Sequence, residues 1–289
     1  MSWNFNRMNK IVFIADFFAN EICGGGELNN QELVEILRDR GTHVLEVKSN
    51  LLTPLFISEC SMEAKFIVSN FVMLSEESKA ILQDDREYII YEHDHKYIRS
   101  RNPANYENFV APKSEIINFN FYKNAKSVLC QSEFHADIVK SNLELNNIIS
   151  LGGNLWTEDS LETMLGMSKV DKNPTCAIMN SSNWHKNTSD AIKLCEAKNW
   201  KYDIIPPCGY IEFLLRLGES EKFIFLPKTP ETLSRIVVEA RMMGLSVITN
   251  NLVGATGEKW FSLKGEELIE VIRDKRVKIP NIVEEKLYE

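Results

Sequence analysis

Several features that would identify other classes of protein are missing from this 289-residue sequence. No uninterrupted apolar run is long enough to span a bilayer, and residues 1–10 (MSWNFNRMNK) lack the apolar core of a signal peptide. Low-complexity tracts are also missing. We therefore expect a cytoplasmic protein without a transmembrane segment, and peripheral attachment to a membrane stays open.

Closely spaced cysteine pairs are lacking as well. The six cysteines are scattered along the chain, which is typical of reduced thiols in a cytoplasm and unlike a disulfide framework or a zinc ribbon. They are Cys23, Cys60, Cys130, Cys176, Cys195 and Cys208.

An excess of positive charge is absent too. The formal net charge of −8 argues against a protein that coats nucleic acid or binds an anionic membrane surface. The length allows two modest domains, each with its own core. Residues 157–173 are polar and acidic with few strand formers, so we expect them to link an N-terminal domain (1–156) to a C-terminal domain (174–289).

The most informative stretch present is FIFLPKTPETLSRIVVEARMMGLSVITNN, residues 223–251, which predicts strand, turn, helix and strand. Both ends are short apolar runs typical of buried parallel strands. Between them one apolar stripe recurs at helical spacing, with Thr229 placed to cap the helix, Pro230 in its first turn and Gly244 at its end. Ligands of parallel sheets bind beyond the carboxyl ends of strands, which points to residues 227–231.

Two carboxylates stand out there, Glu231 in the first helical turn and Glu239 eight residues later. At about 1.5 Å per residue they lie roughly 12 Å apart along the helix and near the same side. A carboxylate is a good acceptor for paired sugar hydroxyls. The alternative is that Glu231 complements the helix dipole while Glu239 pairs with Arg235 on a solvated face.

Taken together, this stretch resembles the donor half of retaining glycosyltransferases of the family-4 type. The resemblance is carried by a strand ending in Pro227, then Glu-x7-Glu-Ala, Gly244 and a Val-Ile strand. The resemblance implies an α/β fold with two Rossmann-like domains facing across a cleft (GT-B). It places the acceptor on the N-terminal domain and the nucleotide-sugar donor on the C-terminal domain. It also implies that Glu231 faces the donor sugar and Glu239 the donor ribose.

The N-terminal domain opens with a predicted strand at residues 10–15, followed by Gly24-Gly25-Gly26-Glu27 and a helical pattern. Free N–H groups at such a helix N-terminus can face a phosphate, although a flexible turn without a ligand is an equal alternative. The spacing is not GxGxxG, which excludes a dinucleotide fingerprint. In the resembled family this loop closes over the donor diphosphate and the acceptor, which implies that role for Gly25 and Gly26.

An apolar strand over residues 87–95 ends in His93-Asp94-His95. A metal site is one interpretation, but adjacent residues seldom converge on one ion, so we expect no bound metal. Histidines that hydrogen-bond at a strand end are the commoner case. The resemblance implies a third interpretation, a histidine lining the cleft, and favours His93.

The densest basic cluster of the N-terminal half follows. Its members suit a solvated loop, or alternatively a docking surface for an acidic acceptor; they are Lys96, Arg99, Arg101 and Lys113. Near the other end of the chain, residues 265–272 predict a final amphipathic helix, and the basic residues 273–278 predict a solvated surface.

Lys186 precedes a predicted helix at residues 189–197. An ammonium group there could meet a diphosphate while the helix N-terminus supports it, and the alternative is an exposed loop lysine. The resemblance implies contact with the donor phosphates. The arginine that the family usually carries a few residues upstream is missing, because Ser181, Ser182 and Asn183 occupy that region.

The resemblance therefore implies a retaining glycosyltransferase, hexosyl or pentosyl, that moves a sugar from a UDP- or GDP-sugar to an acceptor hydroxyl of a glycan or another cell-envelope acceptor. We expect no cofactor and no protein nucleophile, with Thr229, Pro230 and Thr232 also contacting the donor. One alternative is a nucleotide-sugar-binding module without transfer activity, and another is a glycosyltransferase acting on modified DNA bases. A Rossmann oxidoreductase is disfavoured because the glycine fingerprint is wrong.

Overall fold

The computed structural model describes residues 10–22 and 24–289. Residues 1–9, on which the expectation about a signal peptide depends, and the thiol of Cys23 lie outside this description. The chain forms two compact units. Unit 1 contains the described residues up to Gln131 together with Ala136–Leu151 and Arg276–Glu289; unit 2 contains Ser132–His135 and Gly152–Lys275.

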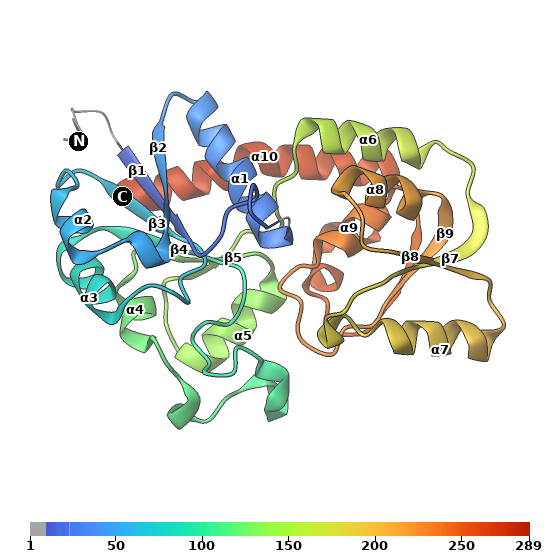
Figure 1. Cartoon of the computed structure of the whole chain (residues 1–289), viewed down its shortest axis with the longest axis horizontal. Coiled ribbons are helices and arrows are strands. Elements are labelled where there is room, and N and C mark those ends of the chain that lie inside the picture. Colours follow the sequence, from blue (N-terminus) through green and yellow to red (C-terminus); the bar gives the residue numbers. More distant parts are fainter. Residues whose placement is uncertain (1–9, 23) are drawn as a thin grey trace. The chain divides into compact units, whose positions relative to one another are not determined.

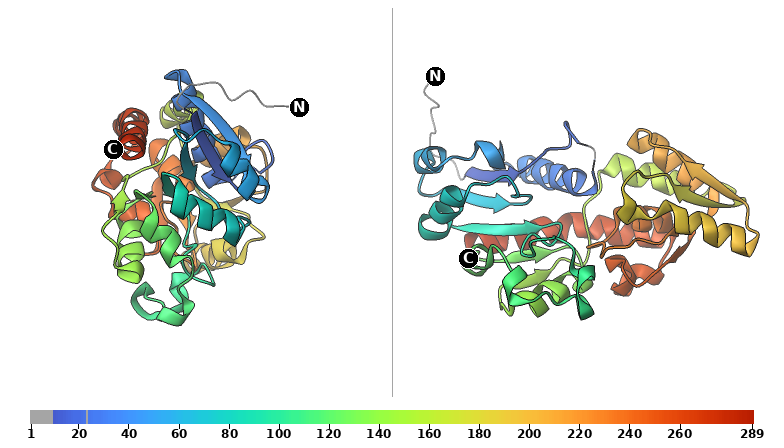
Figure 2. Two further views of the ribbon diagram at one scale, coloured as in Figure 1. Left: turned by 90° about the vertical axis from the view of Figure 1, so that its left-hand side faces the viewer. Right: turned by 60° about the horizontal axis from the view of Figure 1, so that its bottom comes forward.

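Unit 1 is built on a six-stranded parallel sheet, coloured blue to green in Figure 1, with the strand order β2-β1-β3-β4-β5-β6. The strands lie side by side in the views of Figure 2. Their bounds are β1 (Lys10–Ala15), β2 (His43–Lys48), β3 (Lys65–Val68), β4 (Tyr88–Glu92), β5 (Val128–Cys130) and β6 (Ile148–Ser150). The helices between them are α1 (Gly25–Asp39), α2 (Pro54–Glu59), α3 (Glu76–Asp85), α4 (Phe119–Asn124) and α5 (Glu133–Leu143).

The inner strands of unit 1, β1, β3, β4 and β5, are largely apolar on both faces, as expected for a parallel sheet covered by helices. Alternate residues such as Val12, Phe66 and Ile90 pack into one core with side chains from α2 to α5. Their neighbours, such as Phe13 and Ile67, point to the opposite face and are equally buried. The sheet is therefore a rigid platform that leaves only its strand ends for function.

Unit 2 has a four-stranded parallel sheet in the order β10-β9-β7-β8. Its strands are β7 (Asn173–Met179), β8 (Tyr202–Ile205), β9 (Ser220–Phe225) and β10 (Ser246–Thr249). Its helices are α6 (Glu158–Ser168), α7 (Thr188–Lys198), α8 (Tyr210–Gly218), α9 (Arg235–Met242) and α10 (Gly265–Tyr288), the last of which continues into the segment grouped with unit 1. Gly244, at φ +88°, follows the end of α9 as the sequence predicts.

The division of the chain differs from the expected one, because Ser132–His135 and residues 152–156 are grouped with unit 2 and Arg276–Glu289 with unit 1. Residues 157–173 do not form a bare linker, because Thr157 caps α6 by accepting a hydrogen bond from the Ser160 amide, and Leu161 and Met164 of this helix are buried in the unit 2 core. At the other end, residues 273–278 are partly or fully exposed, as the sequence predicts, but the final helix does not end at Ile272. These residues continue α10, which runs on past Pro280, and the part from Arg276 belongs to unit 1.

No helix within residues 10–22 and 24–289 is long and apolar enough to cross a membrane. The cysteines that the structure describes are free thiols. They are Cys60, Cys130, Cys176, Cys195 and Cys208, of which only Cys208 is not fully buried.

Candidate functional site

The strand order of unit 2 identifies where a ligand of this sheet should bind. From β7 the chain moves first to β8 on one side and then to β9 on the other, so the order reverses between β7 and β9. Open α/β sheets bind ligands beyond the carboxyl ends of the strands at such a reversal. Here those ends lead into the loops 180–187 and 226–234.

An ion pair joins the two loops. The ammonium of Lys186, in a single 3-10 turn (Trp184–Lys186), lies 2.8 Å and 3.0 Å from the two carboxylate oxygens of Glu231. The Lys186 side chain is 30% exposed and that of Glu231 16%, so the pair is sheltered but open to solvent. The ring of Phe225, at the end of β9, lies 5.6 Å from the ammonium. The sequence predicts both charged residues as site residues, and the structure brings them together.

Backbone hydrogen bonds hold the loop that carries Glu231. The Lys228 amide donates to the His185 carbonyl at 2.8 Å, which ties this loop to the one carrying Lys186. The Glu231 amide donates to the Leu252 carbonyl at 2.7 Å, and the Gly254 amide donates back to the Glu231 carbonyl at 2.9 Å. Glu231 therefore sits in a short parallel bridge with Val253.

This bridge contradicts the predicted start of the helix. Helix α9 begins at Arg235 and is preceded by Ser234, so Thr229 does not cap it, Pro230 is not in its first turn, and Glu231 is not helical. The estimate of a 12 Å spacing along one helix is therefore wrong in its premise. The loop is extended because long-range bonds to residues 252–254 outweigh the local signals of a cap and a first-turn proline.

Thr229 and Thr232 are partly buried members of the loop, and Pro230 is buried. The Thr232 carbonyl accepts a hydrogen bond from the Ser132 hydroxyl at 2.5 Å. Gly254 is required beside it, because a Cβ atom there would lie only 2.4 Å from the Thr232 carbonyl oxygen. All three predicted residues therefore lie in the same loop as Glu231.

Glu239 lies in α9 and is only 3% exposed. Its Oε1 atom accepts hydrogen bonds from the Trp156 indole at 2.9 Å and from the Tyr210 hydroxyl at 2.8 Å. Arg235 lies 3.7 Å from the same oxygen, so the alternative pairing with Arg235 is present, but it is buried and not solvated. Burial and the neighbouring Glu239 carboxylate raise the pKa of Tyr210 well above its usual value, so this phenol stays protonated as a donor.

In unit 1 the predicted glycines begin α1. Gly24 is the N-cap, and Gly25 and Gly26 form the first turn, where amides have no partner within the helix. A Cβ atom on Gly26 would meet the His93 ring at 3.5 Å, which is ordinary contact. The helix N-terminus and His93 are therefore neighbours.

His93 follows β4, and both of its ring nitrogens have partners. Nε2 lies 2.5 Å from Oδ1 of Asn30 in α1, and Nδ1 contacts the Gln131 side-chain amide. Direct proton transfer by His93 would require one of these contacts to break. His95 points elsewhere, with its Nδ1 2.9 Å from the Tyr97 hydroxyl, and burial lowers the pKa of His95 to about 4.

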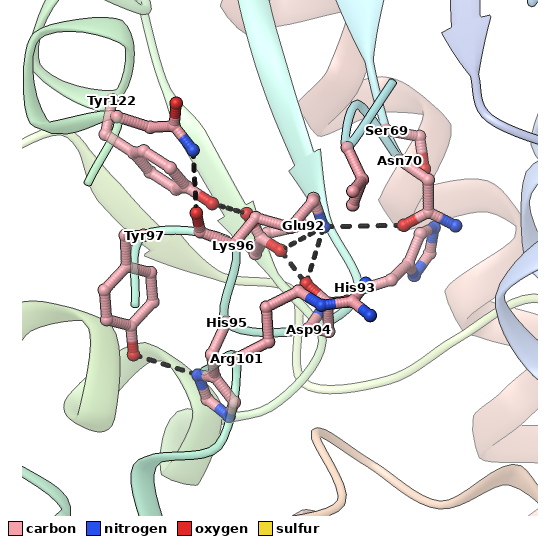
Figure 3. A network of polar contacts seen from close by, with 12 residues as sticks. Ser69, Asn70, Glu92, His93, Asp94, His95, Lys96, Tyr97, Arg101 and Tyr122 are labelled. Atoms are coloured by element: carbon pink, nitrogen blue, oxygen red, sulfur yellow. Dashed lines mark hydrogen bonds and ion pairs between the residues drawn. The ribbon is translucent and has the colours of Figure 1, made fainter. Parts of the chain in front are cut away.

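Lys96 corrects the interpretation of the basic cluster. It is neither solvated nor a docking residue, because its side chain is 2% exposed and its ammonium lies 2.5 Å from Glu92 and 2.9 Å from Asp94 (Figure 3). The Tyr122 hydroxyl also bonds Glu92, and Asn70 lies 3.4 Å from the ammonium. The two carboxylates lie only four and two residues before Lys96 in the sequence, a spacing that an argument from positive charge alone overlooks.

The charges of this network depend on one another. Burial raises the pKa of Glu92, although Lys96 opposes it. Burial acts to lower the pKa of Lys96, but the carboxylates of Asp94 and Glu92 prevail and raise it. Burial alone would raise the pKa of Asp94, but the positive charge of Lys96 outweighs this effect, so the pKa of Asp94 is lowered. The other members of the predicted cluster are exposed: Arg99, Arg101 and Lys113.

Four partners of the predicted site residues escaped the sequence analysis. Asn30 and Gln131 hold His93, while Trp156 and Tyr210 hold Glu239. Each is separated from its partner by 29 to 83 residues, so no local spacing could reveal the contact. In the described part of the chain, no three His, Cys, Asp or Glu side chains group as a metal site requires.

Neither a protein-family model nor a curated protein matches this sequence. Its structure is similar to sucrose-phosphate synthase from Thermosynechococcus elongatus (TM-score 0.62, 9% identity, covering 96% of this chain and 99% of that one). It is also similar to a UDP-forming α,α-trehalose-phosphate synthase from Burkholderia vietnamiensis (0.61, 8%, 98% and 94%). A third is HepE from Anabaena in complex with UDP and glucose (0.54, 12%, 97% and 92%). These similarities confirm the expected α/β fold, two Rossmann-like domains of the GT-B type.

Proposed function

We propose that this protein is a retaining glycosyltransferase that transfers a sugar from a nucleoside-diphosphate sugar to an acceptor hydroxyl. The observation that carries the proposal is the Lys186–Glu231 pair at the carboxyl ends of β7 and β9. This pair places the Lys186 ammonium, which can bind the diphosphate, at hydrogen-bond distance from the Glu231 carboxylate, which can accept hydrogen bonds from sugar hydroxyls. The GT-B fold supports the proposal, since the similar structures named above include one that holds UDP and glucose.

Lys186 is suited to the leaving group. Its ammonium has three donors, and Glu231 takes two of them at 2.8 and 3.0 Å, so a phosphate oxygen can engage the third. Negative charge grows on the diphosphate as its bond to the sugar breaks, and a fixed cation lowers the energy of that state. We also assign the N-terminus of α9 to these phosphates. Because α9 begins at Arg235, this helix end lies at Ser234 and Arg235 and not at Thr229 as the sequence predicts.

Glu231 and Glu239 hold the rest of the donor. Glu231 accepts hydroxyls of the sugar and favours positive charge on its ring. In the described structure, the contacts of Glu239 with Trp156, Tyr210 and Arg235 all reach Oε1. We assign Oε2 to a ribose hydroxyl, with the carboxylate orientation fixed by the two hydrogen bonds on the other oxygen.

The transfer needs no nucleophile from the protein. The bond between the anomeric carbon and the diphosphate oxygen breaks, and its electron pair stays on the diphosphate. The acceptor oxygen bonds to the anomeric carbon from the same face, and its proton passes to the departing oxygen. We assign Gly25 and Gly26 amides to this diphosphate and acceptor region, with His93 lining it.

A binding panel of UDP- and GDP-sugars tests the proposal. A donor that binds the folded state raises the melting temperature. We expect one nucleotide class to do so, and Lys186→Met to weaken its binding by about tenfold, the loss of one charged contact. Transfer is then assayed with the bound donor, and the anomeric configuration of the product is read by NMR.

Different results separate the alternatives. Donor binding without hydrolysis or transfer in an acceptor screen would indicate a binding module. No stabilisation by any nucleotide sugar would refute the proposal, as would an inverted product for its stereochemistry. Lys228→Met is the matched control for Lys186→Met, because Lys228 is an exposed lysine of the neighbouring loop and we assign it no ligand.

A further inference from the structure

Unit 1 contains a cavity of about 770 Å³ that none of the predicted site residues line. Its walls include residues 18–21, which follow β1, and Val47 and Lys48, the last residues of β2. It therefore lies at the carboxyl ends of two neighbouring parallel strands, where open α/β sheets bind ligands. The volume falls within the range of roughly 300–1,000 Å³ typical of small-molecule sites.

The walls combine apolar surface with carboxylates. Phe18, Leu51 and Phe56 supply aromatic and aliphatic surface. The charged lining residues are four glutamates and one lysine, a formal charge of −3: Glu21, Glu35, Glu46, Glu59 and Lys48. Rings that can lie against the apolar face of a sugar, beside acceptors for its hydroxyls, are the chemistry that a carbohydrate requires.

The single lysine is not available to an anion. Its ammonium lies 2.5 Å from Glu21, and this hydrogen bond lowers the pKa of Glu21, so the carboxylate stays ionised beside it. Arg38, just outside the lining, donates to Glu46 at 2.8 Å. Glu35 and Glu59 are exposed, and Arg38 approaches Glu35 only to 3.9 Å. The cavity is therefore acidic even after its ion pairs are counted.

The rest of this sheet end is acidic as well. Asp16, at the end of β1, is buried and accepts hydrogen bonds from the amides of Val72 and Met73 at 3.0 Å. Lys96, a member of the predicted basic cluster, is neutralised by Glu92 and Asp94. A phosphate or carboxylate on a ligand would meet repulsion here.

We propose that this cavity is the acceptor site and that the acceptor is a carbohydrate with no phosphate or carboxylate group, either neutral or an amino sugar. The identification of the bound carbohydrate as the acceptor rests on the proposed glycosyltransferase function, but its binding to the cavity can be measured without any transfer. Hydroxyl and ammonium groups of the acceptor donate to the carboxylates of the cavity, chiefly to the exposed Glu35 and Glu59, while the donor, which is anionic, is excluded from the cavity.

The test is titration of the full chain with glucose, galactose, mannose, glucosamine and N-acetylglucosamine, and with glucose 6-phosphate and glucuronate, followed by saturation-transfer NMR. Gln31, an exposed residue of α1 in the lining, is replaced by tryptophan to fill the cavity and by alanine to leave it open. We expect at least one uncharged or amino sugar to bind, Gln31→Trp to weaken it by about tenfold or more, and Gln31→Ala to preserve it.

The double variant Glu35→Gln with Glu59→Gln should weaken glucosamine more than glucose, because only the former carries charge. The proposal is overturned if only glucose 6-phosphate or glucuronate binds, if no sugar of the panel binds, or if Gln31→Trp leaves binding unchanged. If a nucleotide sugar still binds after such a result, the proposed glycosyltransferase function stands and only the assignment of this cavity is refuted. If a sugar binds in the cavity but no nucleotide sugar binds to the protein, the cavity is a sugar site and the proposed function is refuted.

Discussion

Lys96 in unit 1 and Lys186 in unit 2 each contact a carboxylate in a segment that follows a parallel strand, and the two contacts differ in their exposure to solvent. Lys96 in unit 1 and its partner Glu92 are 2% and 0% exposed, whereas Lys186 in unit 2 and its partner Glu231 are 30% and 16% exposed. The distances are alike, at 2.5 and 2.8 Å. Geometry alone therefore does not separate them.

Burial decides what each contact can do. A buried charge must keep its partner, because desolvation without compensation is costly, so Lys96 is committed to holding the segment after β4. A partly exposed pair contributes little to stability and can exchange its partner for a ligand. Lys96 in unit 1 is thus confined to a structural contact, while the Lys186 ammonium in unit 2 is exposed enough to meet a ligand.

Replacing Lys96 should have the largest effect on stability. Lys96→Met keeps the apolar stem but leaves Glu92 buried without its cation, and we expect a loss of about 3–5 kcal/mol in the free energy of unfolding. Urea denaturation measures it, with exposed Lys113→Met as the control. The double variant Lys96→Met with Glu92→Leu should recover much of the loss. A loss below about 1 kcal/mol for Lys96→Met would show that the network behaves like a surface pair.

His95, beside this network, makes unit 1 sensitive to acid. Its pKa is lowered from 6.5 to about 4, so between these values the unfolded chain binds a proton that the folded chain refuses. The stabilisation is complete above about pH 6.5 and is lost as the pH falls to about 4, amounting to roughly 3 kcal/mol. Asp94 and Lys96 face His95, and the raised pKa values of Glu92 and Glu27 act in the opposite direction.

A difference experiment isolates His95. The pH dependence of urea stability is measured for the wild type and for His95→Gln, whose amide can still bond Tyr97. We expect the wild type to lose stability more steeply than the variant between pH 6.5 and 4. His43→Gln, at an exposed position, should leave the wild-type slope intact. Equal slopes for the wild type and His95→Gln would show that His95 accepts a proton readily in the folded state.

Glu231→Gln should separate function from stability in unit 2. Glu231 is proposed to favour the positive charge that grows on the sugar ring in the transition state, and loss of that stabilisation, about 2.7 kcal/mol, corresponds to roughly a hundredfold fall in turnover. The free energy of unfolding should change by only about 0–1 kcal/mol, since the pair is partly exposed. Turnover and urea stability are measured on the same preparation, with exposed Glu266→Gln as the control. Unchanged turnover would remove Glu231 from the site.

The sequence predicts the site better than its local structure. Apolar periodicity predicts the strand and helix that flank Glu231, the strand-end rule points to residues 227–231, and the family resemblance singles out Lys186. The helix start was wrong, because the hydrogen bonds from Glu231 to Leu252 and from Gly254 to Glu231 cross about 20 residues of sequence. The burial of Lys96 also involves a contact distant in the sequence, since its ammonium lies 5.4 Å from the ring of Phe71.

The segment at 157–168 shows a different kind of failure. The dominance of polar and acidic residues predicts a linker here. However, Thr157 is a favourable N-cap residue, and Leu161 and Met164 lie on one face of the helix. An amphipathic helix with one narrow apolar stripe is polar on average. The average composition of residues 158–168 therefore does not indicate helix α6, whereas the spacing of its apolar residues does.

The smallest expected effect concerns Ser234, which ends the Glu231 loop at φ +74°, a conformation that favours glycine. Ser234→Gly should stabilise the protein by about 0.5–1 kcal/mol because the strain is removed, and Ser234→Ala should not, because alanine keeps the Cβ atom. Thermal unfolding of both variants measures this, and Gly244→Ala, at φ +88° beyond the other end of α9, should destabilise by a similar amount. Equal stability of Ser234→Gly and Ser234→Ala would mean that the loop holds no strain at this residue. A stabilised Ser234→Gly with weakened donor binding would instead show that the strained backbone is retained for the site, in the unit whose ion pair is open to ligand.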